Sequence, residues 1–133
     1  MAMDITWGDT EKTLLNVRIH GDVSWDQYHD MCDEAAALLA SVPHRVDMIF
    51  MAEVDVPSGN PLPHFKRATV RLQESGNLGY CISVVPINIP LAGVFMNLVY
   101  RAYGISSKFR NVYNLEEAQH LIAMSRSSQA PSV

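Results

Sequence analysis

The most informative segment of the chain reads Val46-Asp-Met-Ile-Phe-Met-Ala52. It has the length of a strand and is apolar at every position except the second. A second segment of the same kind, Gly79-Tyr-Cys-Ile-Ser-Val-Val85, follows later in the chain. Strands buried on both faces of a parallel sheet show such continuous apolar runs. Both segments are therefore predicted to be central strands of a parallel sheet.

The segment before these strands shows a different pattern. Leu15, Val17 and Ile19 alternate with polar residues, which is typical of a strand with one exposed face. Residues 5–7 predict a short strand before it, and Gly8-Asp-Thr-Glu-Lys12 predicts the turn between the two. The chain is therefore expected to begin with an antiparallel hairpin.

Helical patterns separate the strands. Ser24-Trp-Asp-Gln27 is a capping box that opens the first helix, whose buried stripe is expected at Trp25, Tyr28, Cys32, Ala35 and Leu39. Pro61 is placed to begin a second helix, which Gly76 and Asn77 end. A third helix is expected from Pro90 to about Tyr103.

The last part of the chain predicts one more strand and one more helix. Residues 108–113 can form a short strand, and Asn114-Leu-Glu-Glu117 opens a final helix that is expected to end near Met124. The predicted order is ββαβαβαβα, so the fold class is α/β with a single mixed sheet and helices packed on it. One domain is expected over 1–124, and the small polar residues 125–133 predict a flexible tail.

Composition excludes several classes of protein. A chain of 133 residues with 48% hydrophobic residues suits one globular domain. Its net charge is −4, and its densest basic cluster, Lys66, Arg67 and Arg71, reads as the wet face of a helix rather than a nucleic-acid site. Residues 75–100 lack charge, but Pro86 and Pro90 argue against a membrane span.

Cys32 and Cys81 are far apart in apolar surroundings, so we expect two free, buried thiols. Together with the absence of a recognisable signal peptide, this favours a cytoplasmic protein. The sequence has no phosphate-binding glycine motif and no metal-binding histidine spacing, so no cofactor and no metal are expected. His29 and Asp33 lie one helical turn apart beside Cys32, a pattern more typical of a helix flank than of a metal site.

Two acidic residues stand where α/β proteins usually build their sites. Glu53 ends the first central strand and Asp55 follows it, at the carboxyl edge of the predicted sheet. With His64 they make one candidate group for a small enzyme. Ser58 and Gly59 lie in the same loop, directly before a helix, where free amides and the helix dipole would stabilise an added phosphate. The alternative is a turn chosen for its small, flexible residues, and the local sequence favours this explanation.

The predicted third helix is apolar on nearly every side. Such a helix is either deeply buried or covered by another molecule. We therefore expect its residues Phe95, Met96, Tyr100 and Tyr103 to border a self-association surface or a groove for an apolar ligand. Burial in the core of the domain is the alternative.

The element order, with Ser58-Gly59 after the central strand, resembles the STAS domain of anti-sigma-factor antagonists and sulfate-transporter tails. Trp25 and Tyr28 in the first helix and Leu115-Glu-Glu-Ala118 in the last are similar to STAS-like bacterial proteins. Antagonists carry Asp-x-Ser-Gly-Leu-Gly at the regulatory loop, whereas this chain lacks the Leu-Gly that follows Ser-Gly.

The resemblance implies a non-catalytic regulatory or protein-interaction module, with Ser58, Gly59 and Asp55 in its regulatory loop. Its expected partner is another protein or a second copy of the chain in a homodimer. Two other functions stay open: a carrier of a small, lipid-like apolar ligand, and a small enzyme with acids at the strand ends.

Overall fold

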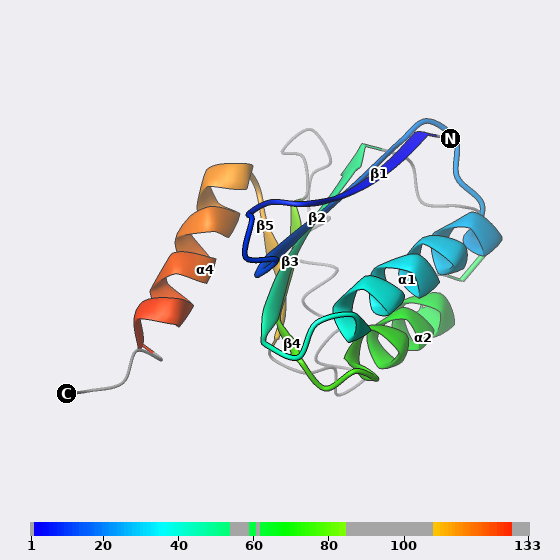
Figure 1. The fold of residues 1–133 in the computed structure, drawn as a ribbon. Helices are drawn as coiled ribbons and strands as arrows, with labels where there is room; N and C mark the ends of the chain where they lie inside the picture. Colours follow the sequence, from blue (N-terminus) through cyan, green and yellow to red (C-terminus); the bar gives the residue numbers. More distant parts are fainter. Residues whose placement is uncertain (1, 54–58, 61, 85–107, 129–133) are drawn as a thin grey trace.

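The computed structural model describes residues 2–53, 59–60, 62–84 and 108–128. These residues form one five-stranded sheet with helices against both faces (Figure 1). The strands lie in the sheet in the order in which they follow along the chain: β1 (Ala2–Trp7), β2 (Leu14–His20), β3 (Val46–Glu53), β4 (Leu78–Val84) and β5 (Phe109–Val112). Only β1 and β2 pair antiparallel. The predicted α/β class, with an antiparallel strand at one edge, is confirmed.

The hairpin turn between β1 and β2 is built around one carboxylate. Asp9 accepts hydrogen bonds from the amides of Thr13 (2.8 Å) and Leu14 (3.1 Å) and from the Thr13 hydroxyl. Burial opposes ionisation of Asp9, but these hydrogen bonds outweigh it and lower the pKa of the carboxyl group. The turn therefore holds Thr13 in place for a contact with the other end of the chain.

Two helices cover one face of the sheet. α1 (Trp25–Ala40) follows β2, and α2 (Leu62–Gln73) follows β3 (Figure 1). The capping box of α1 is confirmed: the Gln27 amide donates to the Ser24 hydroxyl (3.2 Å), and the Gln27 side chain accepts from the Ser24 amide (2.9 Å). Asn60 caps α2 by accepting a hydrogen bond from the Leu62 amide (3.2 Å).

The larger core lies between this helix pair and the sheet. The alternating residues of β2 face it, and Met48 and Cys81 add the central strands. The helices contribute their apolar stripes, with Cys32, Ala35 and Leu39 of α1 and Ala68 and Leu72 of α2 all buried. Trp25 and Tyr28 at the start of α1, and Phe65 in the first turn of α2, are only half-buried.

The opposite face of the sheet carries α4 (Leu115–Ser128) (Figure 1). Ala118 and Ile122 pack there against Ile49, Ile82 and Val112. The predicted capping residues are in place, since the Glu117 amide donates to the Asn114 side chain (2.8 Å). The Glu117 carboxylate differs from the predicted box because it accepts from the Tyr113 amide (2.9 Å), one residue further back.

The prediction that a flexible tail begins at residue 125 is wrong, because the last helix includes residues 125–128. α4 continues four residues beyond Met124 to Ser128, and Ser125 is buried. The Ser125 hydroxyl accepts a hydrogen bond from Arg45 (2.8 Å), and Arg126 donates to the Thr13 carbonyl oxygen (2.8 Å). The small polar residues of this segment therefore make tertiary contacts, and the helix boundary moves from 124 to 128.

Arg126 also reaches a fully buried carboxylate at the amino end of β3. Asp47 is 0% exposed and receives Arg45 on Oδ1 (2.9 Å) and Arg126 on Oδ2 (2.9 Å). The Tyr80 amide donates to Oδ1 as well (2.8 Å). Both oxygens of this buried charge are thus neutralised, and the network fastens the end of α4 to β3 and β4.

Gly79 makes room for the same network. The pairing of β3 with β4 shifts register between Val46 and Met48, opposite Gly79. A Cβ atom at Gly79 would collide with the Asp47 carboxylate and the Arg45 guanidinium. Only glycine leaves the space that this buried ion pair occupies.

Candidate functional site

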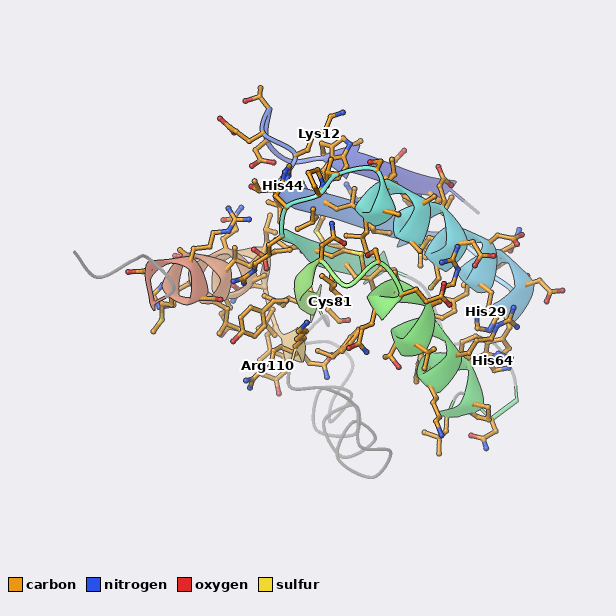
Figure 2. All side chains as sticks on the ribbon, turned by 60° about the horizontal axis from the view of Figure 1, so that its bottom comes forward. Lys12, His29, His44, His64, Cys81 and Arg110 are labelled. Atoms are coloured by element: carbon orange, nitrogen blue, oxygen red, sulfur yellow. The ribbon has the colours of Figure 1, made fainter. Side chains whose placement is uncertain are left out.

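Two histidines meet at the carboxyl edge of the sheet, where α1 and α2 both begin. His29 lies in the second turn of α1, and His64 lies in the first turn of α2. Nε2 of His29 is 2.8 Å from Nδ1 of His64 (Figure 2). This contact joins residues that are 35 positions apart in the chain. It places two imidazoles where α/β proteins usually build their sites.

Aromatic rings hold the histidine pair in position. Trp25 stacks on His64 with ring centroids 4.2 Å apart and an angle of 5° between the planes. Tyr28 meets His29 edge-on at 5.5 Å, and Phe65 meets both Trp25 and Tyr28 edge-on. Each imidazole therefore has an aromatic neighbour as well as its partner, which restricts the orientation of both rings.

The surroundings of His29 disfavour its charged form. Its side chain is only 6% exposed, and burial is the largest cause that lowers its pKa. Arg67 and His64 lower the pKa further, while Asp33 and Asp26 act in the opposite direction. A neutral His29 can donate one hydrogen bond to His64 or accept one from it, depending on which ring nitrogen carries the proton.

An open groove of about 470 Å³ runs from the histidine pair along the seam between α1 and α2. Six further residues line most of it: Cys32 and Asp33 from α1, and Lys66, Arg67, Val70 and Arg71 from α2. Val70 is an aliphatic side chain that is 57% exposed. The groove thus combines one exposed apolar side chain with charges of both signs.

One ion-pair cluster crosses this groove. Arg71 lies 2.9 Å from Asp33 on α1 and 2.8 Å from Glu74, just after α2. The hydrogen bond to Asp33 is the main cause that raises the pKa of Arg71. His29, Cys32 and Asp33 are close in sequence but make different contacts. His29 binds His64, Asp33 binds Arg71, and Cys32 packs in the core.

Both cysteines are free and buried, as predicted. Burial raises the pKa of the Cys32 thiol to about 12, and it raises the pKa of Cys81 as well. A thiol that stays protonated is a weak nucleophile and a weak metal ligand. Cys32 at the floor of the groove therefore acts as an apolar side chain.

Metal chemistry has no support in this part of the chain. Over residues 2–53, 59–60, 62–84 and 108–128, no three His, Cys, Asp or Glu side chains are grouped to hold an ion. Arg67 adds a positive charge beside His29, which also disfavours a bound cation. The expectation of a protein without metal or cofactor stays a prediction.

The other predicted site residues fall in different places. Asp55 and Ser58, and also Phe95, Met96, Tyr100 and Tyr103 with the predicted third helix, lie outside the described residues. Glu53 is the last residue of β3, and Gly59 has a φ of +101°, a conformation that favours glycine. His64 is the one predicted residue that the structure places in the histidine pair.

Sequence reasoning missed the partner of His64 and the role of the groove. The local signals for His29 were its place on α1 one turn after Trp25 and its one-turn spacing from Asp33, and neither identifies His64 as its partner. Nothing near it in the sequence points to a residue 35 positions later.

Comparison with known proteins adds no family to this description. No family model matches the chain, and no curated protein matches it significantly. Within the described residues, every helix is too short or too polar to cross a bilayer.

Proposed function

We propose that this chain is a regulatory or protein-interaction module that binds another protein chain on the face formed by α1 and α2. The observation that carries the proposal is the groove between the two helices. It is long and open, it exposes Val70, and it is flanked by charged side chains of both signs. Such a surface suits a protein segment better than a small molecule, which needs a more enclosed site.

The loop with the proposed regulatory role directly precedes α2 in the sequence. Ser58 is followed by Gly59 and by Asn60, which caps α2, and the groove begins at Pro63 in the first turn of that helix. Phosphorylation of Ser58 would add roughly two negative charges to the segment that precedes the basic helix α2 in the chain. Resemblance to STAS domains supports the same assignment, since their regulatory serine stands before a helix in an equivalent order.

A photo-crosslinking amino acid at Val70 tests the proposal in the cells that make the protein. Met124 provides a matched control, because it is also 57% exposed but lies on α4, on the opposite side of the sheet. We expect a crosslinked protein, either a second copy or a different chain, from position 70 and none from position 124. Capture at neither position, or at both alike, contradicts the proposal.

The switch at Ser58 is tested in the same experiment. If phosphorylation regulates docking, Ser58→Glu changes the yield of crosslinking at position 70 and Ser58→Ala prevents any phosphate-dependent change. Intact-mass measurement on the protein from its own cells shows whether the phosphate is present. Equal yields for both variants, together with an unmodified mass, would remove Ser58 from the proposed mechanism.

The histidine pair favours a second candidate function, a small acid–base enzyme. A histidine whose pKa is lowered by burial is neutral near pH 7 and can accept a proton from a substrate. A panel of ester and phosphoester substrates tests this candidate. Turnover that disappears in both His29→Ala and His64→Ala, while Lys66→Ala retains it, would support an enzyme over an interaction module.

A further inference from the structure

The charges of the two surface helices are separated by sign. α1 contains no lysine or arginine, and its four acidic side chains are all exposed: Asp26, Asp30, Asp33 and Glu34. α2 contains no aspartate or glutamate, and three basic residues lie along it: Lys66, Arg67 and Arg71. An acidic ridge and a basic ridge therefore run next to one another, with the groove between them.

Within the described part of the chain, most of these charges form no ion pair. Arg71 and Asp33 neutralise one another across the groove. Among the residues that the structure describes, Lys66 and Arg67 form no ion pair, and neither do Asp30 and Glu34. Both ridges consequently present exposed charge that a partner surface of matching pattern would complement.

We propose that the α1–α2 face binds the same face of a second copy of this chain, around a two-fold axis parallel to the groove. This axis lays the acidic ridge of each copy on the basic ridge of the other, so the attraction occurs twice. A two-fold axis across the groove would place acidic ridge on acidic ridge, which charge repulsion disfavours. The proposal rests on the proposed function, because it names the occupant of the same face.

The contacts within one copy show which residues would meet. His29 touches His64, and Asp33 pairs with Arg71, so a position on α1 lies level with one 35 to 38 residues later on α2. An axis parallel to the helices preserves these levels. Asp30 and Glu34 of one copy therefore face the segment from Lys66 to Arg71 of its partner, including the exposed Val70.

The size of the face sets the expected strength. α1 has 16 residues, which gives a length of about 24 Å, and two neighbouring helices are roughly 20 Å wide together. This area, about 480 Å² on each copy, is smaller than the roughly 800 Å² that each partner buries in a stable interface, so it suits a weak complex. With one aliphatic side chain and several exposed charges on each side, we expect a micromolar dimer that weakens at high salt.

Sedimentation equilibrium on the purified full chain tests the geometry. One variant reverses two charges of the basic ridge (Lys66→Glu with Arg67→Glu), and the other reverses the two acids that face the basic ridge of the partner (Asp30→Lys with Glu34→Lys). We expect each variant alone to be monomeric at concentrations where the natural chain dimerises. An equimolar mixture should dimerise again, because opposite ridges then meet at both contacts.

Asp4→Lys with Glu11→Lys is the matched control, since it changes the same number of exposed acids away from the helix pair. It should dimerise like the natural chain, and high salt should weaken the natural dimer at least about tenfold. A natural chain that stays monomeric up to high micromolar concentration overturns the proposal. A mixture that stays monomeric, while the natural chain dimerises, overturns it too.

The two proposals fail separately. If the natural chain is monomeric but Val70 crosslinks a different protein in cells, the interaction module stands and the dimer falls. If the dimer forms only through another surface, the charge-reversed variants retain it, which also rejects the proposal.

Discussion

Asp47 is a single buried side chain that connects three elements of the fold. It is a fully buried carboxylate, and two guanidinium groups and one amide bind it. Through these groups it joins the starts of β3 and β4 to the last turns of α4. A buried charge is tolerated only with such partners, so losing the charge leaves the arginines without their counterion.

We therefore expect Asp47→Asn to lower the free energy of unfolding by about 3 kcal/mol. Asp33→Asn is the control, because it removes an ion pair with the same distance, 2.9 Å, between exposed side chains. Exposed pairs contribute about 0–1 kcal/mol, so this variant should be close to neutral. Urea denaturation followed by circular dichroism measures both, and equal losses would contradict the role given to Asp47.

The histidine pair makes a prediction about pH. The pKa of His29 is lower in the folded chain than its ordinary value of 6.5, chiefly because it is buried. The unfolded chain therefore binds more protons than the folded chain as the pH falls below about 6.5. Above that pH the contribution of neutral His29 to stability is complete, and it is lost as the pH falls through the lowered pKa.

His29→Gln isolates this contribution, because its side chain does not titrate. We expect the natural chain to lose stability relative to the variant when the pH is lowered from 7.5 toward 5. The measurement is the difference between the two unfolding free energies at each pH, which cancels the titration of the other groups. A constant difference would show that His29 has the same pKa in the folded and unfolded chains.

At the scale of elements, the start of α1 and the order of strands and helices along the chain were predictable because their signals are local. Ser24 and Gln27 are three residues apart, and the alternation of β2 is complete within seven residues. The end of α4 was not predictable, because the Arg126 contact with Thr13 spans 113 positions. Residues 125–128 have the small, polar composition of a frayed terminus. The contact of Arg126 with Thr13 holds this segment in the helix.

Truncation tests this correction directly. A chain that ends after Met124 loses Ser125 and Arg126, and with them two hydrogen-bonding partners of the Arg45–Asp47 network. We expect it to unfold at least about 2 kcal/mol more easily, because part of a buried charge network is left unsatisfied. A chain that ends after Ser128 retains both residues and should match the full chain in urea. Equal stability of the two truncated chains would show that residues 125–128 do not stabilise the fold and would support a helix end at Met124.

At the scale of the whole molecule, the sheet follows from the sequence and the candidate site does not. The length of the apolar runs and the alternation of apolar with polar residues predict five strands and an antiparallel edge. These patterns can be recognised within each strand, because its own side chains indicate which of its faces are buried. The histidine pair and the groove arise where α1 and α2 meet, and no pattern within either helix specifies the other. His64 was named for its place near a strand end, whereas its contact with His29 required the packing of the two helices.

The strictly sequential order of the sheet also bears on how the chain folds while it is being synthesised. Each strand pairs with the one made just before it, so the sheet can grow in step with emergence from the ribosome. Arg126 emerges 113 positions after Thr13, a delay on the order of ten seconds at usual rates of translation. Asp47 is made 79 positions before Arg126, and until Arg126 emerges it lacks one of its two arginine partners. The strands of the nascent sheet can therefore pair before Arg126 binds Asp47 and the Thr13 carbonyl oxygen. Formation of these contacts ends the interval in which Asp47 is only partly neutralised.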